Sequence, residues 1–425
     1  MNSSAAPSPS TETKGSGPPG ERSWLQTLKF QLGLLTTMQA LLLINNVTMV
    51  TINGLAGYVL TNEKWLATLP VTGYVLGGAV WAMPAAAFMR RFGRRAGYSL
   101  ASFAAMAGGL MAWYAMSEGS LWLLCLATFI AGFYNAFGAS IRFAAADVAD
   151  EYRPSFRAKA ISLVLTGGIM GGVIGPELAK WSRTWLETDF SGTYLTLIGF
   201  AVISLVLAQF IRLPDGRSAP KISGPIRPLR EILAQPICWV AILCAALSYG
   251  VMNLLMVATP LAMQAHDHSF GFTALVIELH VIGMFLPGLI TGWLITRLGV
   301  LPIILVGALL NVACVIVALS GVAVMHFVSA LVLLGVGWNF MYTGGSTLLT
   351  RAYEPQEKNK VQGFMDVCVF TTMISTSASS GALLFVNGWT VLNMISLPIV
   401  LLIMGSVFWL GRQTGWRSDV VPASA

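Results

Sequence analysis

The chain has 425 residues, of which 56% are hydrophobic and only 10% are charged, whereas a soluble domain carries roughly 25% charged residues. This composition excludes a protein whose whole surface faces water, and it predicts a protein embedded in a lipid bilayer. The net charge of +7 arises from basic residues scattered between apolar segments, without a dense basic run, so we expect no nucleic-acid partner.

In chain order, the sequence starts with residues 1–28, which are rich in Ser, Pro, Thr and Gly and are expected to form a disordered cytoplasmic tail. A helix needs about 20 residues to cross the hydrocarbon core of a bilayer. By this criterion the rest of the chain predicts an all-α membrane protein of about twelve transmembrane helices. They are expected to begin near Phe30, Trp65, Gly97, Leu121, Ile161, Thr193, Pro236, Gly271, Leu301, Phe327, Gly363 and Thr390.

A proline-rich polar connection between the sixth and seventh apolar stretches divides the predicted helices into two groups of six. It contains Pro214, Pro220, Pro225 and Pro228. We therefore predict an N-terminal half (29–212), a cytoplasmic linker (213–235), a C-terminal half (236–412) and a cytoplasmic C-terminal tail (413–425).

The basic residues predict the orientation of the chain. They gather in the connections that follow even-numbered helices, whereas the opposite side holds only Lys64, Lys180 and Arg183. Because basic residues are retained on the cytoplasmic side of a membrane, both termini are expected to be cytoplasmic.

The two halves carry matching sequence patterns. The pattern Tyr-x-Pro-x-x-basic-x-Lys occurs at residues 152–159 and again 201 positions later, at residues 353–360. The shorter pattern Arg-x-Gly occurs at residues 91–93 and again 206 positions later, at residues 297–299. Two matches at nearly one offset indicate an internal repeat of six helices. Parallel six-helix repeats are typical of the major facilitator fold.

The stretch from Phe88 to Arg95 adds a motif to this resemblance. It is similar to the loop between the second and third helices of major facilitator transporters, but Ala86 stands where a Gly is usual and Arg90 where an Asp is usual. The resemblance extends over roughly residues 25–412. It implies a monomeric secondary transporter that works by alternating access.

Other chemistry finds little support in the sequence. The chain has no Gly-x-Ser-x-Gly, His-Glu-x-x-His or P-loop motif, so we do not expect an enzyme. Five cysteines are present, and none belongs to a Cys-x-x-Cys pattern. We therefore expect buried free thiols rather than a zinc site or a disulfide framework.

Two spaced pairs of soft side chains indicate a candidate metal site. Met252 and Met256 lie in the seventh apolar stretch, and His280 and Met284 lie in the eighth. An i, i+4 spacing places both members of a pair on one helix face. Thioether sulfur favours Cu(I), and imidazole is a borderline ligand. Because methionine is also a common filler of irregular cores, the spacing alone leaves both interpretations open.

These two pairs resemble the paired signature of the CcoA-like copper importers, a bacterial group within the major facilitator transporters. The resemblance implies that the chain lies in the inner (cytoplasmic) membrane of a bacterium. It also implies that Met252, Met256, His280 and Met284 bind copper in transit, for cytochrome oxidase assembly. Copper is then the transported substrate, no cofactor is expected, and a cytoplasmic copper chaperone is a candidate partner.

An organic substrate such as riboflavin is the alternative. Related riboflavin transporters share the segment Thr259–Met263 and a histidine in the eighth helix. In that case Trp81, Trp113 and Trp338 are candidate stacking surfaces for the substrate.

The remaining candidates fall into two groups. Near the outer end of the seventh helix, Met263, His266 and His268 form either a metal-collecting vestibule or a solvated loop, and Cys244 is either a copper contact or an inert thiol. Charged residues inside membrane helices tend to be functional. The candidates for coupling or gating are Glu278, Asp366, Arg142, Arg94 and Asp147, with Arg94 expected to pair with an acidic group such as Asp147.

Overall fold

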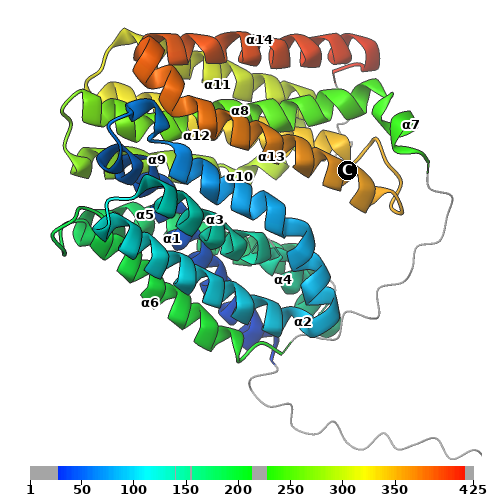
Figure 1. The fold of residues 1–425 in the computed structure, drawn as a ribbon. Helices are drawn as coiled ribbons and strands as arrows, with labels where there is room; N and C mark the ends of the chain where they lie inside the picture. Colours follow the sequence, from blue (N-terminus) through cyan, green and yellow to red (C-terminus); the bar gives the residue numbers. More distant parts are fainter. Residues whose placement is uncertain (1–26, 139, 154–155, 213–226, 417–425) are drawn as a thin grey trace, which may run out of the picture.

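The computed structural model describes residues 27–138, 140–153, 156–212 and 227–416. Within these ranges the chain is helical and contains no strand, which confirms the predicted all-α fold (Figure 1). The predicted tails, residues 1–28 and 413–425, and the predicted linker lie largely outside the described residues.

The helices fall into two consecutive sets, one on either side of the linker. The first set comprises α1 (Leu28–Leu60), η2 (Lys64–Leu66), α2 (Leu69–Ser117), α3 (Leu121–Gly138), α4 (Ile141–Tyr152), α5 (Arg157–Ser182) and α6 (Ser191–Ala208). The second comprises α7 (Leu229–Leu233), α8 (Pro236–Ala265), α9 (Phe270–Phe285), α10 (Gly288–Leu298), α11 (Val300–Ser320), α12 (Val324–Leu349), α13 (Lys358–Ala382), η5 (Leu383–Asn387) and α14 (Gly388–Thr414).

Ten segments of the described chain are long and apolar enough to cross a membrane. Two of them, of 54 and 57 residues, are far longer than the roughly 20 residues that one crossing needs. Each contains a glycine with a positive φ of 84°, Gly93 in the first and Gly388 in the second. If each makes two crossings around its glycine, the described segments provide twelve crossings, as predicted.

The backbone has the same conformation at the glycine of both Arg-x-Gly patterns. Gly93 has φ 84° and ψ 164°, and Gly299 has φ 92° and ψ 158°. Residues other than glycine rarely adopt a positive φ, so the glycine in each Arg-x-Gly pattern provides the same sharp turn in each half.

The glycine run of α5 explains how the first half packs. Gly167, Gly171 and Gly175 occupy one face of α5, and a Cβ at any of them would meet α1. Thr48 of α1 donates a hydrogen bond of 3.1 Å to the carbonyl oxygen of Gly175. Close approach through small residues is a common packing mode in membrane proteins, and here it joins α1 to α5.

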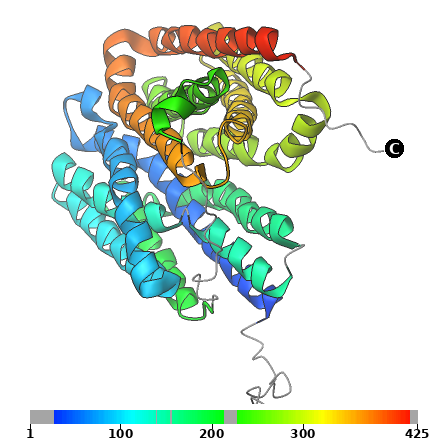
Figure 2. The ribbon, with the colours of Figure 1, turned by 90° about the vertical axis from the view of Figure 1, so that its right-hand side faces the viewer.

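The two halves meet at the end of the molecule opposite α7. There the rings of Tyr58 and Phe385 stack with centroids 5.7 Å apart, and the Gly381 N–H donates a 3.2 Å hydrogen bond to Thr68 Oγ1. Toward α7, the ribbons of the two halves diverge (Figure 1), and viewed from that end they form two separate groups (Figure 2). The α7 end carries the linker and is the predicted cytoplasmic end.

The five cysteines are free thiols, as predicted. Their burial differs from the prediction, because only Cys238, Cys244 and Cys314 are buried, whereas Cys125 and Cys368 are partly exposed. An apolar stretch predicts that a residue lies in a membrane helix, but it does not predict which face of that helix the residue occupies.

Candidate functional site

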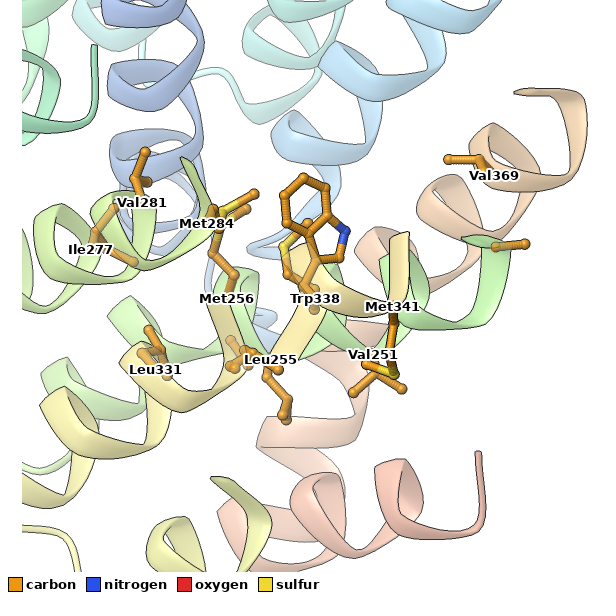
Figure 3. Close-up of a cluster of buried hydrophobic side chains, with 14 of the residues drawn as sticks. Val251, Leu255, Met256, Ile277, Val281, Met284, Leu331, Trp338, Met341 and Val369 are labelled. Carbon is orange, nitrogen blue, oxygen red and sulfur yellow. The ribbon is translucent and has the colours of Figure 1, made fainter. Parts of the chain in front are cut away.

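The four predicted copper ligands are all buried in the second half, with Met256, the most exposed, at 8%. They lie on α8 and α9, yet these two helices share few contacts, whereas α12 packs closely against both. Gly335 of α12 fits against the α9 backbone at His280. Met256 and Met284 lie on the same side of Trp338 of α12 (Figure 3).

One ring nitrogen of His280 forms a hydrogen bond, and the other has no hydrogen-bond partner among the described residues. Its Nδ1 lies 2.7 Å from the carbonyl oxygen of Leu331 in α12. Because a carbonyl can only accept, Nδ1 carries the proton, and Nε2 holds a lone pair. Within the described residues Nε2 is buried and has no hydrogen-bond partner. A histidine oriented in this way through its other nitrogen is typical of metal ligands.

The residues given either as a metal-collecting vestibule or as a solvated loop differ in their surroundings. Met263 is fully buried, whereas His266 is exposed. His268 Nε2 lies 2.7 Å from the carbonyl oxygen of Val322. Cys244 lies within hydrogen-bonding reach of Ser406 on α14, because its position on α8 faces that neighbouring helix. The described residues contain no cluster of three or more His, Cys, Asp or Glu side chains suited to a metal.

An aromatic cluster lies beside the buried methionines. Trp338 and Tyr342, one turn apart on α12, stack with centroids 5.2 Å apart and planes 7° from parallel. Tyr249 of α8 meets both rings edge-on, at 5.2 Å from Trp338 and 5.4 Å from Tyr342. We call Tyr249, Trp338 and Tyr342 the aromatic cluster.

The aromatic cluster keeps polar groups available. Trp338 is only 6% exposed, and its Nε1 has no hydrogen-bond partner among the described residues. Its indole stands out from α12, with Met284 on one side and Val369 of α13 on the other (Figure 3). Tyr249 and Tyr342 are partly exposed. A flat ring can therefore reach the two tyrosines, whereas the indole N–H of Trp338 is buried beneath them without a hydrogen-bond partner among the described residues.

Two of the predicted coupling residues lie near the aromatic cluster, one from each half. Arg142 on α4 and Asp366 on α13 both have exposed side chains. Their charges interact with each other and with the hydroxyl of Tyr342. Since α4 and α13 belong to different halves, Arg142 and Asp366 are exposed charges of opposite sign on the two sides of the boundary between the halves.

The other charged candidates lie away from this space. Arg94 Nη2 lies 2.7 Å from Asp147 Oδ2, which is the expected pairing between α2 and α4 and lies within the first half. Glu278 on α9 lies near Glu177 and Lys180 of α5, at the end where the halves meet. Glu177 and Lys180 are themselves paired at 3.1 Å.

The three tryptophans proposed as stacking surfaces are not brought together. Trp81 packs in the first half against Phe133, with centroids 5.0 Å apart, and Trp113 is packed against the hydrophobic core. Of the three, only Trp338 has a stacked aromatic neighbour, Tyr342 of the same helix. Tyr342 and Tyr249 were not among the sequence candidates, although the i, i+4 spacing of Trp338 and Tyr342 was a usable signal.

Comparison with known proteins assigns the family. The Major Facilitator Superfamily profile matches residues 34–285 and 241–424. The riboflavin transporter RfnT of Brucella anthropi is 38% identical over 373 residues, which cover 87% of this chain and 93% of that protein. The uncharacterized MFS-type transporter YddS of Bacillus subtilis is 28% identical over 86% of this chain and 87% of that protein.

Solved structures show the same fold. The nucleoside transporter NupG (D323A mutant) matches with a TM-score of 0.72 at 13% identity, over 90% of this chain and 100% of that one. A bacterial homolog of the human lysosomal transporter Spinster, in an inward-facing and occupied conformation, matches with a TM-score of 0.67 at 17% identity, over 93% and 99%.

Proposed function

This chain belongs to the Major Facilitator Superfamily, and we propose that it carries riboflavin or a closely similar flavin across the membrane by alternating access. The observation that carries the proposal is the 38% identity with a named riboflavin transporter over 87% of the chain. It supports the organic-substrate alternative over the copper prediction.

The aromatic cluster suits this substrate. The isoalloxazine ring of riboflavin is flat and aromatic, and such rings gain from offset stacking on tyrosine and tryptophan. The partly exposed ring of Tyr342, backed by Trp338, offers a surface of this kind. The unpartnered Trp338 Nε1 can donate to a polar atom of the ring system.

The first test is transport itself. We expect purified protein in liposomes to accumulate riboflavin, and a Tyr342→Ala variant to bind it about tenfold more weakly, since one aromatic contact contributes about 1 kcal/mol. Binding is followed by the quenching of flavin fluorescence. Tyr342→Phe retains the ring and should bind nearly as well as the wild type. Tyr114→Ala, at an exposed tyrosine of α2, is the matched control.

Copper is a second candidate, favoured by the buried His280 Nε2 without a partner and by the nearby thioethers of Met256 and Met284. The same liposomes should be assayed for copper uptake. Under the flavin proposal, Met256→Leu leaves riboflavin uptake intact, because the substitution conserves volume and removes only the sulfur. Copper uptake that disappears in Met256→Leu, together with no riboflavin uptake by the wild type, would replace the flavin proposal.

A further inference from the structure

Arg142 and Asp366 are opposite charges that the two halves present to one another inside the membrane. Asp366 lies eight residues after the first residue of α13, and Arg142 lies ten residues before the last residue of α4. At 1.5 Å per helical residue, these positions are about 12 Å and about 15 Å from the α7 end of their helices. The two charges therefore lie at similar depths.

Neither charge is neutralised by a close partner. Among the described residues, neither Asp366 nor Arg142 forms an ion pair, and the guanidinium carbon of Arg142 lies 4.9 Å from the centroid of the Phe143 ring. Charged groups within the membrane are costly, and they generally face a water-filled cavity or pair with one another. Both side chains are exposed, so both are available to a ligand in the space between the halves.

The aromatic cluster favours a ligand with a flat ring. Tyr342 stacks on Trp338 at 5.2 Å, and Val369 of α13, one turn after Asp366, lies beside Trp338 on the side away from Met284 (Figure 3). A ligand lying flat on Tyr342 therefore brings one edge toward an acceptor and a strong donor. The edge that fits carries an N–H beside a carbonyl, because a carboxylate only accepts hydrogen bonds and a guanidinium only donates them.

We propose that Asp366 and Arg142 form the polar subsite for the pyrimidine edge of the flavin, with Asp366 accepting a hydrogen bond from its N3–H and Arg142 donating to an adjacent carbonyl. The inference rests on the proposed function and adds the residues that recognise the substrate. Because Asp366 belongs to the second half and Arg142 to the first, the bound edge bridges the halves. This subsite distinguishes a flavin from a flat hydrocarbon that would stack equally well.

The test combines a protein variant with a modified ligand. Riboflavin and N3-methylriboflavin are titrated against the wild type, Asp366→Ala and Asp366→Asn, with flavin fluorescence as the readout. The wild type should bind riboflavin about tenfold more tightly than the N3-methyl compound, since a hydrogen bond to a charged group is lost. Asp366→Ala should bind both ligands equally and weakly. Asp366→Asn retains a neutral acceptor and should keep part of the preference.

Arg142→Ala should weaken the binding of both ligands by a similar factor, because it removes a donor to a carbonyl that both possess. Glu278→Gln removes a carboxylate from a membrane helix at the opposite end of the molecule and should leave the N3-methyl preference unchanged. Size-exclusion chromatography shows whether each variant folds.

The outcomes separate the two proposals. If the wild type does not bind riboflavin, the proposed function fails. If the wild type binds it, and Asp366→Ala retains the full preference over N3-methylriboflavin, the subsite is wrong and the proposed function stands. If Asp366→Ala binds riboflavin as tightly as the wild type, Arg142 and Asp366 pair with each other rather than with the substrate, and the subsite is again overturned.

Discussion

Glu357 and Arg227 form the most enclosed ion pair among the described residues. Arg227 Nη2 lies 2.6 Å from Glu357 Oε2, and Arg227 Nε donates to Oε1 at 2.8 Å, while the Glu357 side chain has no exposed surface. Lys360 Nζ donates to the Arg227 carbonyl at 3.0 Å. These contacts join the C-terminal part of the predicted linker to the connection between α12 and α13.

The Arg227 guanidinium, with help from backbone N–H donors, lowers the pKa of Glu357 from its ordinary value of 4.5 to about 2. A carboxyl whose pKa is lowered by folding stabilises the folded state fully above its ordinary pKa. That stabilisation disappears as the pH falls from 4.5 toward 2.

We therefore expect Glu357→Gln to lower the thermal midpoint by on the order of 2 °C, with the same difference from the wild type at pH 8 and at pH 5. Below about pH 4.5 the difference should shrink. Thermal unfolding in detergent, followed by intrinsic fluorescence, measures it. Glu354→Gln is the control, because the hydrogen bonds between Glu354 and Glu357 use only the backbone of Glu354. A difference that grows on acidification contradicts the assignment.

At the residue scale, the sequence indicated which side chains are candidates for function, but it did not predict which side chains contact one another. The Arg94–Asp147 pair follows from a basic loop and an acidic helix end close to one another in the fold. The aromatic cluster depends instead on α12 packing against α8, and no pattern in either helix reveals that contact. Asp366 and Arg142 stood out because charges are rare in membrane helices, but only the fold places them opposite one another.

Among the elements, α5 packs against α1 with one face and against α9 with another. Gly167, Gly171 and Gly175 face α1, whereas a Cβ at Gly172 would lie 2.8 Å from Val281 Cγ1 of α9. The sequence run predicts close packing through glycines four apart, and α1 is the partner. The second face of α5 packs against α9 of the other half. The contact at Gly172 must therefore change when the two halves move relative to one another.

Gly172→Val should push α5 and α9 apart and disfavour contact between the halves at the end opposite α7. Since the Cβ distance is shorter than real Cβ contacts, we expect riboflavin transport to fall at least tenfold while the protein still folds. Gly199→Val is the matched control, because a Cβ there meets nothing within 4 Å. Equal transport in both variants would contradict a role for the contact between α5 and α9.

Periodicity and length predicted the helices well but placed some breaks poorly. The predicted second and third helices are separated by the sharp turn at Gly93 within α2, before the expected start at Gly97, and the eighth divides into α9 and α10 at Leu286 and Pro287. Short turns between helices carry little polar sequence, so hydropathy alone does not reveal them. The Arg-x-Gly repeat did locate two of these turns correctly.

Across the whole molecule, contacts between the halves gather at one end. Phe190 and Phe270 lie edge to face with centroids 5.5 Å apart, and the guanidinium of Arg183 lies over both rings at 5.1 Å and 5.2 Å. These contacts belong to the same end as the Tyr58–Phe385 stack. In the described residues, the α7 end holds its ion pairs within single halves, as in Arg94–Asp147 and Arg227–Glu357. Closing the molecule at the α7 end therefore requires the contacts at the opposite end to separate.

Two pairs of spin labels test this motion. One pair replaces Arg153 and Glu354, exposed residues at the α7 end that occupy equivalent positions in the two repeats. The other replaces Glu63 and Val386, exposed residues at the opposite end.

Alternating access exchanges one closed end for the other, so a population with a shorter Arg153–Glu354 distance should show a longer Glu63–Val386 distance. Pulsed electron resonance with and without riboflavin measures both distance distributions. Because a ligand shifts populations only through its different affinities for the two states, riboflavin should change both distributions together and in opposite directions. A change confined to one pair, or two distances that lengthen together, would contradict rocking of the two halves around a shared site at Arg142 and Asp366.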